Sequence, residues 1–281
     1  MGTPDSNDYW NSQFASTHSA VVIALNYTKA PGAPFPQPIH DLEALFRAAL
    51  DDEDLLPHID RSQIALAGWS AGANLALAIS QLPSIREHLT AIVPMYPMVE
   101  FGLPYAEKIR TRRYKPSLGG FRARETDYLL KMMPMFDWAY LPHGQNLHDP
   151  LLCPLFATRE TLPQRVFVIG CEMDMLAHEA WRLACTLARR ELPDMGDVVG
   201  QENVAEKKGE LILTDERYHW EVKGGEGSES WSYKWLLVPD TIHGFDQTIG
   251  RMVKDPELVA DAQAKTKECI QLIGEWLFRE S

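Results

Sequence analysis

Residues 68–72 of the chain read Gly-Trp-Ser-Ala-Gly, which matches the pattern G-x-S-x-G. Small residues on both sides of the serine permit a sharp turn from a strand into a helix, and this turn lifts the serine hydroxyl clear of the sheet. The pattern alone is weak, but the apolar run Ile64–Ala67 precedes it and the helix-forming run Ala73–Ala78 follows it. We therefore expect Ser70 to be a nucleophile.

A serine hydroxyl needs a base to remove its proton near neutral pH, and imidazole titrates in the required range. Of the nine histidines, His243 is the best candidate, because it follows an apolar strand and because Gly244 gives its loop conformational freedom. His178, His143 and His148 are better explained as structural or solvent-facing residues. No HExxH or similar ligand spacing occurs, so we expect neither a metal site nor a cofactor.

The third group must hold the imidazole in one tautomer and stabilise its charged form, which is a task for a carboxylate. Asp174 is best placed, because it follows the apolar run 166–170 and would lie at the same edge of the sheet as the serine. Glu172 and Glu179 are the alternatives, and Glu179 is also explained as a charge near a helix N-terminus. The order Ser, Asp, His along the chain is the one found in α/β-hydrolases.

Short apolar runs alternate with longer amphipathic segments, which predicts an α/β fold whose mostly parallel sheet has helices on both faces. Strands are predicted at Ala20–Tyr27, Ile64–Gly68, Ala91–Tyr96, Arg165–Gly170 and Tyr233–Pro239. Helices are predicted at Asp41–Ala49, Ala73–Gln81, Leu176–Arg190 and Pro256–Phe278. A further excursion at Glu210–Val222 alternates only weakly.

Two segments interrupt this alternation. Residues 98–162 are too long for a plain connection, and we expect a partly helical, cap-like insertion that serves as a lid. Residues 192–231 are polar and contain glycine, which indicates a surface insertion. We therefore expect a single domain over residues 1–281, with a catalytic core formed by 1–97 and 163–281.

The composition excludes several classes of protein. A formal net charge of -12 disfavours nucleic acid and anionic lipid surfaces as partners, and the longest apolar runs are far below the roughly 18 residues of a membrane span. The polar N-terminal residues 1–10 contain no signal-peptide core, which favours the cytoplasm.

The cysteines show no CxxC pairing and are expected to be buried free thiols; they are Cys153, Cys171, Cys185 and Cys269.

These motifs together resemble the hormone-sensitive-lipase-like branch of the α/β-hydrolase family. The matching segments are Asn26-Tyr27, Ala30-Pro31, Pro34–Pro36, Gly68–Ala76, Asp174–Leu176 with Glu179, and His243–Phe245. The resemblance implies a carboxylic-ester hydrolase that forms an acyl-enzyme on a small or medium acyl ester. It makes Ser70, Asp174 and His243 the catalytic residues and the Ala71 backbone N–H an oxyanion donor. We also expect Trp69, beside the serine, to contact the substrate.

Members of this branch carry an His-Gly-Gly-Gly segment whose N–H groups complete the oxyanion hole, and nothing in the sequence matches it. By position it would end just before Met1, and the strand preceding it would lie between the strands predicted at 20–27 and 64–68. We therefore expect N-terminal strands to be missing and the DNA immediately upstream to encode such a segment. Losing an oxyanion donor costs roughly 3 to 4 kcal/mol in the transition state.

Two other functions remain open on the sequence alone. One is a ligand-binding protein on the hydrolase scaffold, as in the gibberellin receptors that resemble this branch. The other is a truncated and inactive hydrolase product.

Overall fold

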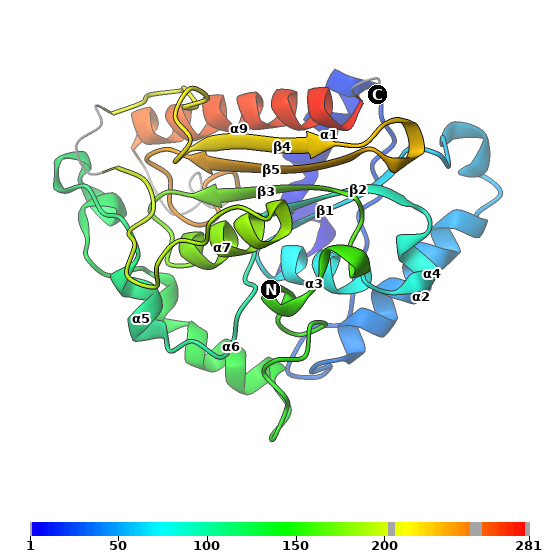
Figure 1. The fold of residues 1–281 in the computed structure, drawn as a ribbon, viewed down its shortest axis with the longest axis horizontal. Helices are drawn as coiled ribbons and strands as arrows, with labels where there is room; N and C mark the ends of the chain where they lie inside the picture. The colour runs from blue at the N-terminus through cyan, green and yellow to red at the C-terminus, as the bar shows by residue number, and fades with distance from the viewer. Residues whose placement is uncertain (1, 202–205, 248–254, 279–281) are drawn as a thin grey trace.

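The fold is centred on a five-stranded sheet in a computed structural model that describes residues 2–201, 206–247 and 255–278. The strand order is β1-β2-β3-β5-β4, with the first four of these parallel and β4 antiparallel at one edge (Figure 1). The strands are β1 (Ile64–Trp69), β2 (Leu89–Met95), β3 (Arg165–Cys171), β4 (His219–Gly224) and β5 (Trp231–Val238). The mostly parallel α/β sheet expected from the sequence is confirmed, and the carboxyl ends of its parallel strands meet at one edge.

Helices cover both faces of the sheet (Figure 1). One face carries α1 (Asp8–His18) and α9 (Pro256–Leu277), and the other carries α2 (Gln37–Asp51), α3 (Ala71–Ile79) and α7 (Ala177–Ala188). Helix α9 begins after Asp255, whose side chain accepts hydrogen bonds from the backbone N–H groups of Glu257 and Leu258. The other α-helices in the described part of the chain are α4 (Pro83–Arg86), α5 (Tyr105–Arg110) and α6 (Met133–Tyr140).

Strand β3 shows why the apolar runs of the sequence form buried strands. Val166 and Val168 pack in the cluster that includes α7, whereas Phe167 and Ile169 pack in the cluster that includes α1 and α9. All four side chains are buried. A strand covered on both faces needs apolar side chains at successive positions, which produces a continuous apolar run.

The strand predicted at Ala20–Tyr27 is wrong. This segment is irregular and pairs with none of the described strands, and Val21 and Ile23 are 48% and 44% exposed. An apolar β-branched run becomes a strand only where a neighbouring strand accepts its hydrogen bonds. Within the described ranges, β1 pairs with β2 alone, so this segment has no such neighbour.

Several described elements outside residues 98–162 were not predicted from the sequence, among them β4 and α1. The weakly alternating region near Glu210–Val222 contains β4, which pairs with β5 along the edge of the sheet. Helix α1 occupies a polar stretch for which no helix was predicted, since only Trp10 and Phe14 form its buried stripe. Their rings stack with centroids 5.1 Å apart.

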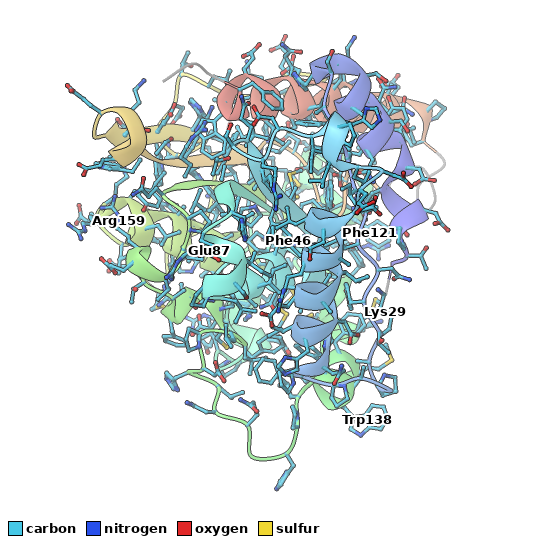
Figure 2. All side chains as sticks on the ribbon, turned by 90° about the vertical axis from the view of Figure 1, so that its right-hand side faces the viewer. Lys29, Phe46, Glu87, Phe121, Trp138 and Arg159 are labelled. Atoms are coloured by element: carbon cyan, nitrogen blue, oxygen red, sulfur yellow. The ribbon has the colours of Figure 1, made fainter. Side chains whose placement is uncertain are left out.

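Residues 98–162, expected to be a partly helical insertion, contain α5, α6 and several short 3-10 helices. One side of α6 faces outward, with Pro134, Met135 and Trp138 exposed; Trp138 is 76% exposed and lies at the edge of the molecule (Figure 2). The inner side chains of the insertion pack against Met175 and Leu176, directly after β3. The insertion therefore contacts the carboxyl edge of the sheet.

All four cysteines are buried and unpaired, as the sequence led us to expect. Across the described ranges, no helix combines the length and apolar character needed to cross a membrane.

Candidate active site

Ser70 lies between the last residue of β1 and the first residue of α3. Its backbone has φ 54° and ψ -118°, a conformation that costs a non-glycine residue about 1–3 kcal/mol. The Ser70 N–H donates to the Met95 carbonyl at 3.0 Å, which ties this turn to the end of β2. Gly68 permits the turn because a Cβ atom there would lie 2.3 Å from the Gly72 carbonyl oxygen.

His243 follows β5 and approaches the serine from the neighbouring loop. Its Nε2 atom lies 2.7 Å from Ser70 Oγ, and its Nδ1 atom lies 2.6 Å from Asp174 Oδ2. The histidine is 5% exposed. The structure thus joins the three predicted residues in one continuous chain of hydrogen bonds.

Asp174 follows β3 and is held in place through both carboxylate oxygens. Oδ2 bonds His243, while Oδ1 accepts the Leu176 N–H at 2.9 Å. The carboxylate is 1% exposed, so water does not compete for these bonds. This arrangement fixes the imidazole ring with Nε2 directed toward Ser70.

The two alternative carboxylates bond other partners. Glu172 accepts hydrogen bonds from Lys115 Nζ at 2.8 Å and from the Tyr218 hydroxyl at 2.5 Å. Glu179 forms a buried ion pair with Lys108 and accepts the Val99 N–H at 2.7 Å. Neither of these bonds involves His243.

The alternative histidines also lie in other surroundings. His178 bonds the Asp194 carbonyl at 3.0 Å, and His143 and His148 are exposed.

Two opposing effects set the charge preference of His243. Burial lowers the pKa of His243, but the charge and hydrogen bond of Asp174 outweigh burial, and the net effect is a raised pKa. The carboxylates of Asp127 and Asp246 act in the same direction. The site therefore favours the imidazolium that forms when His243 takes a proton.

Asp246 links three segments around the histidine. It accepts the Trp69 Nε1–H at 2.8 Å and the Tyr96 hydroxyl at 2.5 Å, and the Tyr96 ring packs edge-on against His243 with centroids 4.7 Å apart. Burial raises the pKa of Asp246, while the two hydrogen bonds lower it in part. We expected Trp69 to contact the substrate; in the structure its indole N–H donates to the Asp246 carboxylate.

The sequence pointed to neither Asp246 nor Tyr96. The available signal was an acidic residue directly after His243–Phe245, and no periodicity marks it.

Ala71 is the first residue of α3, so its backbone N–H has no acceptor within the helix. The residue is exposed and directly follows Ser70. Its N–H can therefore reach an oxygen atom bound next to the serine.

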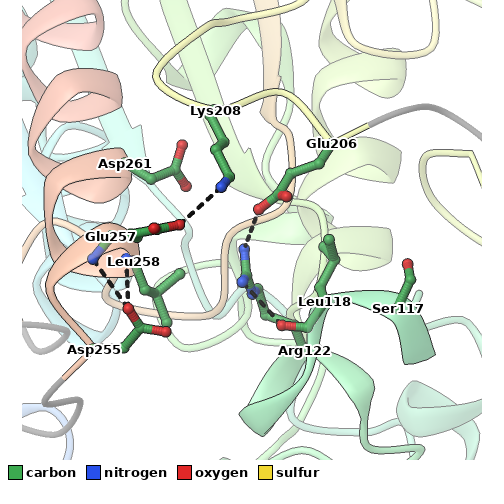
Figure 3. A pocket seen from close by; sticks show the side chains of 9 residues that line it. All are labelled: Ser117, Leu118, Arg122, Glu206, Lys208, Asp255, Glu257, Leu258 and Asp261. Carbon is green, nitrogen blue, oxygen red and sulfur yellow. Dashed lines mark hydrogen bonds and ion pairs between the residues drawn. The ribbon is translucent and has the colours of Figure 1, made fainter.

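A charged pocket lies elsewhere in the fold (Figure 3). Its walls come from the 98–162 insertion, the segment before β4 and the start of α9: Ser117, Leu118, Arg122, Glu206, Lys208, Asp255, Glu257, Leu258 and Asp261. Lys208 pairs with Glu257 at 2.9 Å, and Arg122 approaches Glu206 at 3.4 Å. Since charged side chains make up most of its lining, the pocket offers little apolar surface to an acyl chain.

Comparison with known proteins places this geometry in context. The model of a family with the alpha/beta hydrolase fold matches residues 1–197. An esterase from Pyrobaculum calidifontis superposes with a TM-score of 0.66 at 21% identity, covering 98% of this chain and 72% of its own. Carboxyl esterase 2 from Tuber melanosporum gives 0.65 at 16% identity, covering 99% and 72%. A fungal esterase from Rhizomucor miehei gives 0.63 at 20%, covering 98% and 69%.

Proposed function

Because the chain belongs to this alpha/beta hydrolase family, as its motifs implied, we propose that it is a serine carboxylic-ester hydrolase. Ser70 is the nucleophile and His243 is the base. Asp174 is the carboxylate that orients the imidazole and stabilises its protonated form. The observation that carries this proposal is the unbroken path of short hydrogen bonds from Ser70 Oγ through the imidazole to Asp174. Such a path activates a hydroxyl that is otherwise a poor nucleophile.

The first half-reaction forms the acyl-enzyme. His243 Nε2 takes the proton from Ser70 Oγ as the oxygen attacks the ester carbonyl, and the Ala71 N–H donates to the resulting oxyanion. Asp174 stabilises the imidazolium during this step. The tetrahedral intermediate then collapses, and His243 gives its proton to the departing alcohol.

The second half-reaction restores the serine. A water molecule takes the place of the alcohol, His243 removes its proton, and the water oxygen attacks the acyl carbonyl. The carboxylic acid leaves as Ser70 regains its proton from His243. The raised pKa of His243 supports both half-reactions, because each passes through the imidazolium.

The choice of an ester substrate rests on the comparisons, since the same groups also serve other acyl transfers. The three solved structures compared above are esterases by description. We propose small or medium acyl esters as the substrate class.

Replacing Ser70 with Ala tests the assignment. Hydrolysis of a short-chain aryl ester should fall by roughly 10⁴-fold or more, because the base then has no hydroxyl to activate. Ser117→Ala is the matched control: Ser117 is exposed and lines the charged pocket, so turnover should be unchanged.

Unchanged turnover in the Ser70 variant would remove Ser70 from the mechanism. Ligand binding without turnover by the unsubstituted protein would favour the ligand-binding alternative instead.

A further inference from the structure

A buried ion pair within residues 98–162 stands out because it is far from solvent. Arg112 Nε donates to Asp127 Oδ2 at 3.1 Å, and both side chains are 1% exposed. Burying two charges carries a large desolvation cost, and an apolar pair of similar volume is often equally stable. The position of the pair therefore calls for an explanation beyond stability.

The remaining hydrogen bonds of the pair fall on both sides of Asp174. Arg112 Nε also donates to the Met173 carbonyl at 2.9 Å, and Asp127 Oδ2 accepts the Met175 N–H at 3.0 Å. The residues immediately before and after Asp174 are thus each held by one member of the pair. The Asp174 side chain itself stays free to bond His243.

The pair is anchored within its own segment. Asp127 Oδ1 accepts the Leu129 N–H at 2.9 Å, and the Arg112 guanidinium donates to the carbonyls of Arg124 at 2.7 Å and Phe121 at 3.2 Å. With these bonds the two side chains have little rotational freedom. They therefore fix the loop that carries Asp174 relative to the insertion.

Tyr128, which follows Asp127 in the sequence, connects the insertion to the loop that carries His243. The Tyr128 hydroxyl donates to the His243 backbone carbonyl at 2.9 Å. Three residues of one insertion therefore contact the backbone of two loops that carry site residues.

We propose that Arg112 and Asp127 are positioning residues that hold Asp174 at the distance and angle at which it can orient His243. This rests on the proposed function and deepens it.

Asp127 also has an electrostatic role. Within the described ranges, the charged or polar groups around His243 are Ser70, Asp174, Asp127, Asp246 and Tyr96, with the Tyr128 hydroxyl on its backbone carbonyl. Burial and the neighbouring Asp174 raise the pKa of Asp127, while the bonds from Leu129, Arg112 and Met175 lower it in part. A charged Asp127 favours the imidazolium form of His243.

Asp127→Asn tests the proposal, with Asp137→Asn as the control. An asparagine at 127 has one acceptor oxygen where the aspartate has two, so its amide N–H₂ group replaces either Oδ1, which accepts the Leu129 N–H, or Oδ2, which accepts the Arg112 and Met175 N–H groups. The first loss loosens the anchoring of the pair in its own segment, and the second releases the Asp174 loop directly. Asp137 belongs to the same segment and accepts a hydrogen bond from the Tyr105 hydroxyl, but no bond of the Asp174 loop involves it. The two variants therefore separate loop positioning from general loosening of the insertion.

Two measurements are made on each variant. The first is kcat on an aryl ester, normalised to active sites titrated with a fluorophosphonate. The second is the pKa of His243 from ¹⁵N NMR of the imidazole, assigned by its loss in His243→Gln. We expect Asp127→Asn to lower kcat by about ten- to hundredfold with KM little changed, and to lower the pKa of His243 by about half a unit. Asp137→Asn should change neither.

Equal kcat and equal His243 pKa in the Asp127 variant and the unsubstituted protein would overturn the proposal. If Asp127→Asn does not fold, Arg112→Met/Asp127→Leu replaces the pair by apolar side chains. This variant removes a positive and a negative charge together, so the expected change is the same fall in kcat with KM little changed, and an unchanged kcat would overturn the proposal. The NMR reading is independent of turnover. A protein without esterase activity would therefore refute the proposed function, while the His243 pKa would still decide the positioning role.

Discussion

The three residues proposed to act together come from distant parts of the sequence. The bond between His243 and Ser70 joins residues 173 positions apart, and the bond to Asp174 spans 69. Each of the three follows a parallel strand, so strand order brings them to one edge of the sheet. Strand order does not determine how each side chain is oriented. The Leu176 N–H orients the Asp174 carboxylate, and the turn geometry orients the Ser70 hydroxyl.

The pH dependence of activity follows from the pKa of His243. The histidine must be neutral to accept a proton from Ser70, so kcat/KM should rise with pH through that pKa. Burial lowers the pKa, but Asp174 outweighs it, so the midpoint should lie above the ordinary value of about 6.5. In Asp174→Asn the midpoint should move to lower pH, and the acylation rate should fall by about 10⁴-fold because the tautomer is no longer held. A pH–rate profile of both proteins measures this.

Glu179→Gln is the control for this prediction. Removing the Glu179 charge should reduce stability, because Lys108 is then buried without its partner, but it should leave the midpoint in place. A mild effect of Asp174→Asn together with a large loss in Glu179→Gln or Glu172→Gln would mean that the wrong carboxylate has been named.

At the scale of elements, the strand, turn and helix around the serine depend on one close approach of backbone to backbone. Gly68 in β1 lies against the carbonyl of Gly72 in α3, with no room for a Cβ atom. Gly72 itself has no neighbour within 4 Å of the position its Cβ would take. Steric crowding therefore requires glycine at position 68 but not at position 72.

This difference predicts opposite effects of two similar substitutions. Gly68→Ala should destabilise the protein by about 1–3 kcal/mol through overpacking and should displace Ser70, with loss of fluorophosphonate labelling. Gly72→Ala should keep labelling and raise stability slightly, since alanine favours a helix by roughly 0.5–1 kcal/mol over glycine. Thermal unfolding and labelling rates measure both. Equal tolerance of alanine at the two positions would contradict the geometry of the turn.

Secondary-structure elements were predictable where a local run of apolar residues is enough to indicate a buried strand. Residues 166–170 and 64–68 are continuous apolar runs, and both form strands in which the chain supplies a partner. Residues 20–27 carry the same local signal but are unpaired, because pairing depends on which strands lie alongside, and no local pattern encodes that. Strand β4 was missed because Trp220 is the one buried residue among its six, so its sequence shows little of the apolar and polar alternation of a half-buried strand.

The site divides in the same way. Ser70, Asp174 and His243 were predictable from motif and strand order. Arg112, Asp127 and Asp246 were not, because their roles arise from contacts between segments far apart in the sequence. In sequence they are charged residues in irregular segments, where exposure to solvent is the ordinary expectation.

At the scale of the whole molecule, the helices on both faces keep the sheet rigid while the 98–162 insertion reaches its carboxyl edge (Figure 1). The insertion is joined to the Asp174 loop through Arg112 and Asp127 and to the histidine loop through Tyr128. The serine turn is joined to β2 and, through Trp69, to Asp246. Four separate parts of the chain therefore hold one small set of atoms, as preorganised catalysis requires.

The most direct test of the account is to trap the acyl-enzyme. The protein is mixed with an aryl ester, quenched in acid within the first turnover, and examined by intact-mass and peptide mass spectrometry. We predict a mass increase of one acyl group per chain, located on Ser70, together with a burst of released phenol and no adduct in Ser70→Ala. Undiminished hydrolysis of the ester by Ser70→Ala, or an adduct on any other residue, would contradict the central claim that Ser70 carries the acyl group.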